Sequence, residues 1–396
     1  MLYCIAVDGP KSVEAASNIG DAKASAPPWP SHARCVVHMD LDCFYASVET
    51  LLEPSLQGKP LAVVMGLDAQ GHGVVTTASY AARSFGVRSA ISLANARKLC
   101  PELIVLPVRH SIYREFSARV MRILHEVSPR VQQVSIDEAF VELSDPIAGW
   151  HALTAARSAI LEGIGLACSF GIAPNKLVAK IATGQGKPVG FTVVLPGSES
   201  SFLAPLPVDE LWGVGPRTAA RMREIGIETL GDLAARDPIE LAETFGPRRA
   251  MELHHGALGA DDSPLVTDRQ YKSISAEQTL GRGETDARRL WALIREMASD
   301  VAHRMASEGL VARTIGIKLR LDDWKLLTRD RTLPDQTDDP ARIAAVAGDL
   351  MRAHWQRGTP LRLIGLRVSS LGAKPEGSQL PLFPAVSSDH TEATAR

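Results

Sequence analysis

The sequence predicts an α+β protein built from several domains, and three observations support this prediction. A chain of 396 residues is long enough for two to four domains. Between about 35 and 200, strand-like runs and helical periods follow one another as β-α-β-β-α-β once an insert from about 44 to 110 is set aside, which is the ferredoxin-like order. Residues 271–371 mix strands and helices again, so we expect a second, smaller α+β sheet.

Each predicted element rests on the spacing of its apolar residues. Runs of roughly four to eight mostly apolar residues indicate strands, and apolar spacings of three and four indicate helices. In the first sheet the strands are Cys35–Asp40, Val131–Ile136, Ala139–Leu143 and Leu166–Ile172, with helices at Ser111–Val127, 150–162 and Asn175–Thr183. The insert has strands at Leu61–Met65 and Gly73–Thr77 and helices at Ser79–Phe85 and Ser92–Cys100. The second sheet has strands at Val311–Leu321 and Leu361–Val368 and helices near 286–308 and 340–356.

The composition is that of an ordinary soluble globular protein, with 45% hydrophobic and 22% charged residues. No apolar run approaches the roughly 18 residues needed to span a bilayer, and the opening residues lack the basic leader of a secretory signal. We therefore expect a cytoplasmic protein without a membrane segment. The five scattered cysteines, none in a CxxC pair, predict reduced thiols and neither a zinc site nor a disulfide framework.

The charge is unevenly distributed, and both ends of the chain differ from its middle. A net charge of −2 argues against a uniformly basic nucleic-acid-binding protein, yet residues 313–331 contain six basic and three acidic residues, which favours a local basic face.

Residues 1–33 are rich in Ala, Ser and Pro without a sustained period, which indicates a disordered extension or an upstream start codon. In the polar tail 372–396, the apolar stretch 379–383 is typical of a docking peptide.

An adjacent acidic pair, Asp137 and Glu138, lies between two strand-like runs and would occupy the tip of a tight hairpin. In the ferredoxin-like order the third strand lies antiparallel between the first and second. The end of the first strand, which carries Asp40, therefore meets this hairpin. Neighbouring carboxylates repel each other unless solvent or a cation compensates them, so a divalent metal is the hypothesis to test. A solvated turn would explain the pair alone, but it does not anticipate the convergence with Asp40.

Two further motifs have chemical consequences. Asp42 follows Asp40 by two residues, and we expect it to have a helix-capping or structural role. Gly213 and Gly215 open a helical segment in the pattern of a helix-hairpin-helix, whose exposed backbone N–H groups suit a phosphate. A plain helix-turn-helix connection fits the two glycines equally well.

Six motifs follow one another along the chain: HMDLDCFYASVE, TTASYAARSFGVRSA, SIDEAFVEL, NKLVAKIATGQGKPVG, LWGVGPRTAARM and QLPLF. Together they cover about 35 to 383, and the chain resembles the Y-family, lesion-bypass DNA polymerases of the bacterial DNA polymerase IV kind. The resemblance implies a right-hand polymerase with a ferredoxin-like palm. Its expected parts are a disordered extension (1–33), a palm (34–43 and 110–198), fingers (44–109), a helix-hairpin-helix thumb (199–262), a linker (263–270), an α+β little finger (271–371) and a disordered tail with a clamp-binding peptide (372–396).

The resemblance also implies the metal site. Asp40, Asp137 and Glu138 match the metal-binding carboxylates of the family, and the backbone carbonyl of Leu41 would be a further ligand. The expected cofactor is Mg²⁺, two ions per active site, because Mg²⁺ prefers hard oxygen ligands. Two such ions about 3.5–4 Å apart would activate the primer 3′-hydroxyl and stabilise the departing pyrophosphate.

The nucleotide contacts come from the same resemblance. Tyr45 matches the steric gate, an aromatic ring that excludes a 2′-hydroxyl, although by residue type alone an aromatic at a helix start belongs to the core. The implied triphosphate contacts are Thr77, Tyr80, Arg83 and Lys180. Without the motif, the arginine and the lysine would be ordinary surface charges, whereas phosphate recognition uses their charge-assisted hydrogen bonds. Ser79 stands where relatives often have Asn, which leaves its local hydrogen bond open.

The partners that the resemblance implies are primer–template DNA, a dNTP and the replication sliding clamp, and we expect the chain to act as a monomer. Gly213 and Gly215 would place backbone amides at a DNA phosphate. The little-finger DNA contacts expected on sequence-independent electrostatics are Lys318, Arg320, Arg329 and Arg331. The clamp-binding residues are Gln379, Leu380, Leu382 and Phe383.

The function implied is error-prone, template-directed DNA synthesis past lesions. The chain offers no second acidic cluster and domain for proofreading, so we expect no 3′–5′ exonuclease. Two alternatives are a non-catalytic relative that acts as a DNA-bound scaffold and a palm-fold nucleotide cyclase. The scaffold would lack the carboxylates, and the cyclase would have no use for a thumb, a little finger or a clamp peptide.

Overall fold

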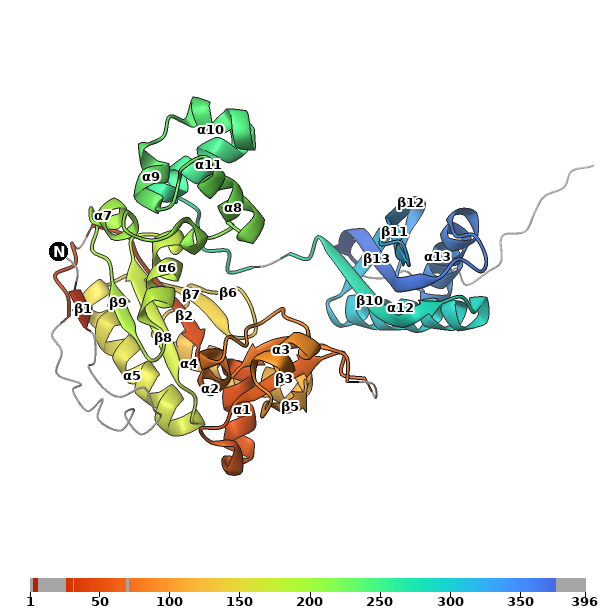
Figure 1. The fold of residues 1–396 in the computed structure, drawn as a ribbon, viewed down its shortest axis with the longest axis horizontal. Helices are drawn as coiled ribbons and strands as arrows, with labels where there is room; N and C mark the ends of the chain where they lie inside the picture. Colours follow the sequence, from red (N-terminus) through yellow and green to blue (C-terminus); the bar gives the residue numbers. More distant parts are fainter. Residues whose placement is uncertain (1–2, 6–25, 31, 69–70, 269, 375–396) are drawn as a thin grey trace, which may run out of the picture. The chain divides into compact units, whose positions relative to one another are not determined.

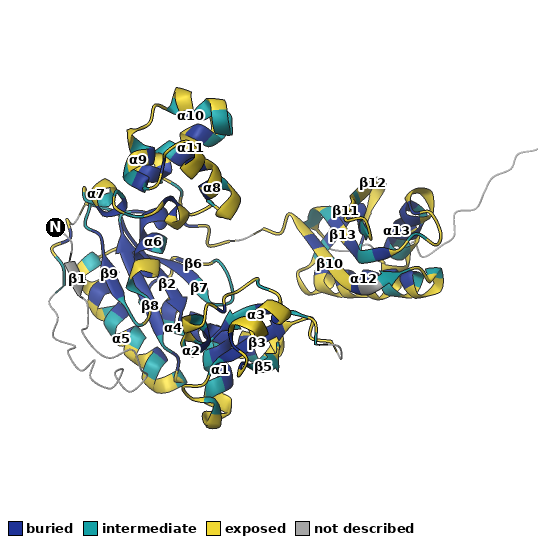
Figure 2. Cartoon of the chain, viewed as in Figure 1, coloured by how far each residue is buried: buried dark blue, intermediate teal, exposed yellow. Residues whose placement is uncertain are grey.

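The computed structural model describes residues 3–5, 26–30, 32–68, 71–268 and 270–374. The chain divides into two compact units, Met1–Asp268 and Arg269–Arg396 (Figure 1). Each unit buries its own apolar core beneath exposed outer surfaces (Figure 2). Within the described ranges, no helix has the length and apolar character that a bilayer-spanning segment requires.

A six-stranded sheet forms the centre of the first unit, in the order β1, β9, β8, β2, β7, β6. The bounds are β1 Tyr3–Ile5, β2 Cys35–Leu41, β6 Val131–Gln133, β7 Glu138–Leu143, β8 Cys168–Ala173 and β9 Phe191–Val193. β2 is antiparallel to both β7 and β8, and β6 is antiparallel to β7. The four strands that the sequence predicts are therefore arranged in the ferredoxin-like order, which confirms that prediction.

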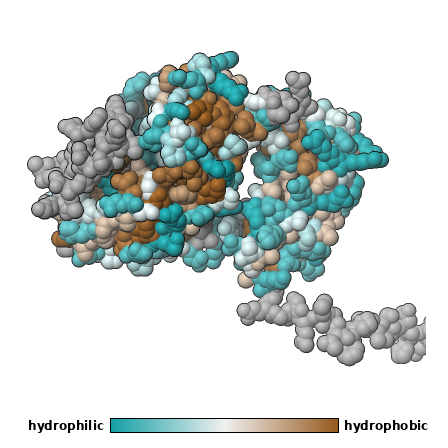
Figure 3. All heavy atoms as spheres, turned by 90° about the horizontal axis from the view of Figure 1, so that it is seen from below, coloured by the Kyte–Doolittle hydropathy of each residue, from teal (hydrophilic) through white to brown (hydrophobic). Residues whose placement is uncertain are grey.

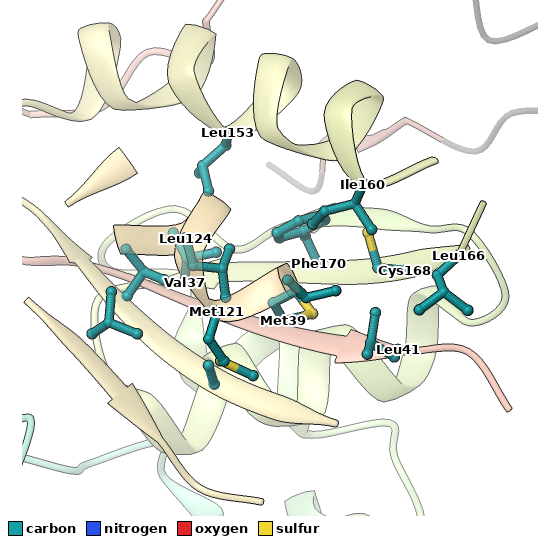
Figure 4. Close-up of a cluster of buried hydrophobic side chains, with 14 of the residues drawn as sticks. Val37, Met39, Leu41, Met121, Leu124, Leu153, Ile160, Leu166, Cys168 and Phe170 are labelled. Atoms are coloured by element: carbon teal, nitrogen blue, oxygen red, sulfur yellow. The ribbon is translucent and has the colours of Figure 1, made fainter. Parts of the chain in front are cut away.

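Helices cover both faces of this sheet. They are α4 (His110–Val127) and α5 (Pro146–Ile164) on one face and α6 (Lys176–Gly186) on the other. Successive residues of a strand point to opposite faces, and Val37, Met39 and Leu41 of β2 pack with α4 and α5 in the buried cluster of Figure 4. His38 and Asp40 therefore lie on the α6 face. The alternation places Asp40 on the opposite face from the apolar core beneath α4 and α5.

The insert between β2 and α4 is a small unit with its own three-stranded sheet, in the order β4, β3, β5. Its elements are α1 Phe44–Leu52, a 3₁₀ turn at Pro54–Leu56, β3 Leu61–Met65, β4 Val74–Ala78, α2 Tyr80–Ser84, α3 Leu93–Leu99 and β5 Ile104–Pro107. The short strand β5 was not predicted. Ser79 caps α2, because its Oγ accepts from the N–H of Ala82 at 3.3 Å. The serine thus supplies the local hydrogen bond that the sequence left open.

A group of short helices follows the sheet and shares a core with α6. Its elements are α7 Glu199–Leu203, η3 Val208–Glu210, α8 Pro216–Glu224, α9 Leu230–Ala235, α10 Pro238–Phe245 and α11 Pro247–Ala257. Polar contacts connect the end of this group to the start of α6: Asn175 Nδ2 donates to the carbonyl of Gly259 at 2.8 Å, and Asp261 Oδ2 accepts from the N–H of Leu177 at 3.0 Å. The helical group is therefore joined to the sheet by a defined interface.

The second unit is the expected small α+β sheet, with the strands in the order β10, β13, β11, β12. Its elements are β10 Ser273–Glu284, α12 Ala287–Ser307, β11 Leu310–Leu321, β12 Leu326–Thr337, α13 Pro340–His354 and β13 Leu361–Ala373. All neighbouring strands are antiparallel, and the two helices cover one face. The strands β10 and β12 were not predicted from the sequence.

The ends of the chain depart from the expected pattern. Residues 1–33 were predicted to lie outside the fold, whereas β1 pairs antiparallel with β9 and Trp29 packs into the first core. The predicted tail begins at Gly372, but that residue still belongs to β13 and pairs with Val311. These segments were missed because three-residue strands and isolated aromatics have no period to detect. The predicted clamp-binding residues 379–383 lie outside the described residues.

Hydrophobic residues also reach the surface, mainly on the first unit, as the brown areas of Figure 3 show. Among the described residues, the large exposed hydrophobics of the second unit are Tyr271, Trp324 and Leu326, and all others belong to the first unit. The cysteines of the described core, Cys35, Cys43, Cys100 and Cys168, are buried free thiols.

Candidate active site

Two of the three predicted carboxylates lie opposite each other on neighbouring strands. Asp40 of β2 and Glu138 of β7 are register partners in an antiparallel pair, so their side chains share one face of the sheet. The N–H of Leu41 donates to the carbonyl oxygen of Asp137 at 3.0 Å, which brings Asp137 to the same edge. The backbone therefore brings the three acids to one edge of the sheet, as the topology predicted.

Two lysines form ion pairs with acids of this edge. Lys187 Nζ forms an ion pair with Asp40 Oδ1, and Lys180 Nζ lies 2.7 Å from Glu138 Oε1. Sequence reasoning identified Lys180 but missed Lys187, although both lie in the same motif. The signal that could have found it is the end of α6 at Gly186, which directs the next residue back toward β2. The position of a helix end is poorly determined by apolar spacing alone.

The third acid is engaged differently. Asp137 Oδ1 accepts a hydrogen bond from the hydroxyl of Ser135 at 2.5 Å, two residues earlier in the same turn. In the described part of the chain, no three His, Cys, Asp or Glu side chains converge as a preformed metal-binding group. The donor set still fits a divalent cation, because it consists of hard carboxylate oxygens whose present partners are two partly exposed ammonium groups and a hydroxyl. Asp40, Asp137 and Glu138 could hold the metal once those partners turn away.

The protonation of Asp40 reflects its burial. The pKa of Asp40 is raised from 3.8 to about 7. Burial is the largest cause, the adjacent Lys187 ammonium partly opposes it, and the negative charges of Glu138 and Asp137 add to it. A carboxyl group with this pKa is balanced between its two protonation states near neutral pH. A bound cation would favour the ionised form.

Asp42 is held in place by neutral donors, which confirms its structural role. The side chain is buried, and Oδ2 accepts from the Ser169 hydroxyl at 2.9 Å and from the N–H of Val189 at 2.8 Å. The hydroxyl of Tyr80 donates to Oδ1 at 3.2 Å. Asp42 therefore connects the insert, through α2, to the sheet.

Tyr45, the predicted steric gate, lies at the start of α1 and is buried. Its ring stacks on Tyr113 of α4, with centroids 4.1 Å apart and planes inclined by 14°. Burial raises the pKa of Tyr45, and the nearby charge of Asp137 raises it as well, so the ring lies beside the acidic edge. Tyr113 in turn donates to Glu49 Oε1 at 2.5 Å, and Glu49 is ion-paired with Arg109. The sequence analysis did not predict these contacts of Tyr113, Glu49 and Arg109. The signal that could have indicated them is the charged Glu49 among the apolar residues of α1.

Three of the other predicted nucleotide contacts come from the insert, whereas Lys180 lies on α6. Thr77 lies on β4 and Tyr80 begins α2. The Arg83 guanidinium lies 5.3 Å from the centroid of the Tyr80 ring, and its Nε donates to the carbonyl of Ala78 at 3.1 Å. The link from Tyr80 to Asp42 places this pair of side chains next to the acidic edge.

The helix-hairpin-helix turn has the backbone that the two glycines predict. Gly213 has a φ of +89°, a conformation that residues with a Cβ rarely adopt, and Gly215 is the N-cap of α8 with Pro216 at the first helical position. Arg249 Nη2 donates to the carbonyl of Gly213 at 2.7 Å and fixes the turn to α11. The expected DNA contact at this turn stays a prediction.

The four basic residues expected to contact DNA do not share one face of the second sheet. The register partners of Arg329 and Arg331 are isoleucines buried beneath the helices, and Arg331 Nη1 lies 3.4 Å from Asp349 of α13. Lys318 and Arg320 alternate with the buried residues of β11 and therefore lie on the face that no helix covers. Only this second pair is placed on the open face.

Three family models match the chain. The model of the impB/mucB/samB family matches residues 39–184, the model of its C-terminal domain matches 271–382, and the model of the IMS family HHH motif matches 196–227. The first match contains the acidic edge, and the third contains the turn at Gly213 and Gly215. Together they span most of the chain.

Curated relatives and solved structures agree with these matches. The chain is 42% identical to DNA polymerase IV of Methanoculleus marisnigri over 86% of this chain and 95% of that protein, and 39% identical to DNA polymerase IV of Streptomyces coelicolor over 92% and 76%. A Y-family DNA polymerase chimera superposes with a TM-score of 0.75 at 27% identity, covering 86% of this chain and 99% of the chimera. The sheet, the helical group and the second unit thus correspond to a palm, a thumb and a little finger, and the chain belongs to the Y family of DNA-directed DNA polymerases, in the DNA polymerase IV group that performs translesion synthesis.

Proposed function

We propose that the chain extends a primer 3′-hydroxyl by two-metal nucleotidyl transfer from a dNTP, releases pyrophosphate, and has no proofreading exonuclease. The observation that carries the proposal is the cross-strand pairing of Asp40 with Glu138, with Asp137 at the same edge. Membership of the Y family supports the reaction, and the carboxylate chemistry supports Mg²⁺ as the metal.

The residues of the chain would divide the work as follows. Asp40, Asp137 and Glu138, with the carbonyl of Leu41, would hold the cations, which would lower the pKa of the 3′-hydroxyl and stabilise the charge of the departing pyrophosphate. If a cation displaced Lys187 from Asp40, the freed ammonium would be available to pair with a phosphate oxygen of the nucleotide.

The nucleotide would lie between the palm and the insert, which acts as the fingers. Lys180 pairs with Glu138, and Thr77, Tyr80 and Arg83 come from the insert; together the four would contact the triphosphate. Tyr45 would lie under the deoxyribose, where its stacking on Tyr113 leaves the ring little freedom to move away from a 2′-hydroxyl. A rigid aromatic at this place excludes ribonucleotides by steric overlap.

Primer extension with Mg²⁺ tests the site. Asp137→Ala is expected to abolish extension, because it removes one of three anionic ligands. Asp145→Asn is the matched control: it also changes an acid of the palm, but Asp145 caps α5 and Asn keeps that capping hydrogen bond. Equal extension by wild type and Asp137→Ala would discard the site assignment, and degradation of a labelled primer by pure protein without dNTP would contradict the absence of an exonuclease.

We further propose that the chain acts as a monomer and binds the sliding clamp through Gln379, Leu380, Leu382 and Phe383. Removal of residues 379–383 should abolish binding to purified clamp while leaving clamp-independent extension on a short template unchanged. Unaltered clamp binding by the truncated chain would assign the interaction to another surface.

A further inference from the structure

The thumb presents one aromatic side chain to the palm next to the acidic edge. Trp212 lies in the turn that precedes α8 and is 46% exposed. Its ring centroid is 6.1 Å from that of Phe140 on β7, and the Lys180 ammonium lies 5.6 Å from the same indole. The Lys180 ammonium is also 2.7 Å from Glu138 Oε1. A single lysine of the palm therefore contacts a thumb residue and a predicted metal ligand at once.

The strand geometry explains why these groups meet. Glu138 and Phe140 are two residues apart on β7, so their side chains project from the same face of the sheet. Lys180 approaches that face from α6, and Trp212 lies against Phe140 from the thumb. The π-face of an indole attracts an ammonium group, so the ring limits the conformations open to a flexible lysine side chain.

Neighbouring contacts hold the segment that carries Trp212 in place. The preceding Leu211 is buried in the cluster that contains Phe140 and the apolar face of α6. The start of α6 is also tied to the segment after the thumb, because Lys176 Nζ donates to the carbonyl of Pro264 at 2.9 Å. The indole is thus attached to a firm interface between thumb and palm.

We propose that Trp212 is a positioning residue that keeps the Lys180 ammonium at the acidic edge, where it pairs with Glu138 in the metal-free protein and would pair with a triphosphate oxygen once a cation occupied Glu138. The inference rests on the proposed function, in which Lys180 contacts the triphosphate of the incoming nucleotide. Without the indole, Lys180 samples more rotamers, and the nucleotide binds less tightly while the chemical step stays the same. The KM for dNTP therefore rises and kcat changes little.

A double-mutant cycle in the full-length chain separates this role from a general role of the thumb. Trp212→Leu is expected to raise the KM for dNTP about three- to fivefold, the usual size of a partly exposed cation–π contact. Trp212→Phe keeps an aromatic face and should restore most of the loss. In a Lys180→Met background, Trp212→Leu should change the KM no further. An unchanged KM, or an equal effect of Trp212→Leu in both backgrounds, would overturn the proposal.

Two further measurements complete the test. The affinity for primer–template DNA without dNTP should be the same for wild type and Trp212→Leu; a weakened affinity with an unchanged KM would instead identify Trp212 as a DNA contact. In the metal-free protein, the shifts in thermal midpoint for Trp212→Leu and Lys180→Met should be non-additive, because the two side chains interact. The thermal midpoint needs no polymerase activity, so this measurement distinguishes a failure of the proposed reaction from a failure of the contact between Trp212 and Lys180. Additive shifts would refute that contact.

Discussion

Replacing Asp40 by Asn is expected to stabilise the metal-free protein while abolishing primer extension. The Asp40 side chain is buried, and its pKa of about 7 shows that the fold disfavours its charge. Asn has nearly the same size and carries no charge, so it removes this cost without leaving a cavity. Lys187 loses its ion-pair partner, but its side chain is 25% exposed and its ammonium can turn to water.

The magnitude follows from linkage between protonation and folding. The folded protein favours the protonated form of Asp40, because the pKa of this group is raised above 3.8. The stability that goes with this protonated form is fully present below pH 3.8 and is lost as the pH rises through about 7. At 1.36 kcal/mol per pH unit, that interval corresponds to about 4 kcal/mol. The favourable ion pair with Lys187 is already included in this pKa, so its loss is not subtracted again. Asp40→Asn should therefore raise the free energy of unfolding by about 3–4 kcal/mol at pH 8 and by about 1–2 kcal/mol at pH 5.

Urea unfolding in the presence of a chelator at both pH values measures this difference. Addition of Mg²⁺ at pH 8 should then stabilise the wild type and leave Asp40→Asn unaffected, because only the wild type retains the full ligand set. Asp42→Asn is the matched control and should be destabilising, since both oxygens of Asp42 accept hydrogen bonds from the fold. A variant at Asp40 no more stable than wild type at pH 8, or a difference that does not grow from pH 5 to pH 8, would refute the reasoning.

Three other perturbations follow from the contacts described. Tyr45→Ala should increase ribonucleotide incorporation relative to deoxyribonucleotide by roughly ten- to a hundredfold in kcat/KM, and an unchanged ratio would count against the steric gate. Tyr113→Phe should lower the free energy of unfolding by about 1–3 kcal/mol, because buried Glu49 loses a donor; an unchanged urea midpoint would contradict this. Gly171→Ala should cost about 3 kcal/mol or more, since its Cβ would lie 2.1 Å from a backbone carbonyl of α6, whereas Gly184→Ala meets no atom within 4 Å and should be tolerated in the same melting experiment.

The buried strands could be predicted from the sequence because they consist of short runs of apolar residues. The strand predicted at Leu61–Met65 has the bounds of β3, and the prediction at Ala139–Leu143 differs from β7 by one residue. β12 was missed because Leu326–Thr337 is mostly polar and exposed, and pairing with β11 alone makes it a strand. Such edge pairing is a tertiary effect that no local period reveals.

In the candidate site, too, some features follow from the sequence pattern and others depend on tertiary contacts. The convergence of Asp40 with Asp137 and Glu138 could be predicted because it follows from strand order, which the alternation of elements determines. The ion pair with Lys187 and the stacking of Tyr45 on Tyr113 could not, because they depend on where one helix ends and on how another packs across the sheet. Side-chain partners are decided by packing, so motif spacing finds the acids but not the groups that neutralise or support them.

Asp40 and Asp42 lie two residues apart at the end of one strand, yet their partners suit them to different tasks. Both oxygens of Asp42 accept from hydroxyl or backbone donors that are fixed in the fold, so a cation could bind there only by breaking several hydrogen bonds. Asp40 is paired with one flexible ammonium, which a divalent ion can replace without leaving a buried donor unsatisfied. The partner of Asp40 can therefore be exchanged for a cation, whereas the partners of Asp42 cannot. For this reason a metal should select Asp40 over Asp42, although the sequence offers both carboxylates at the same strand end.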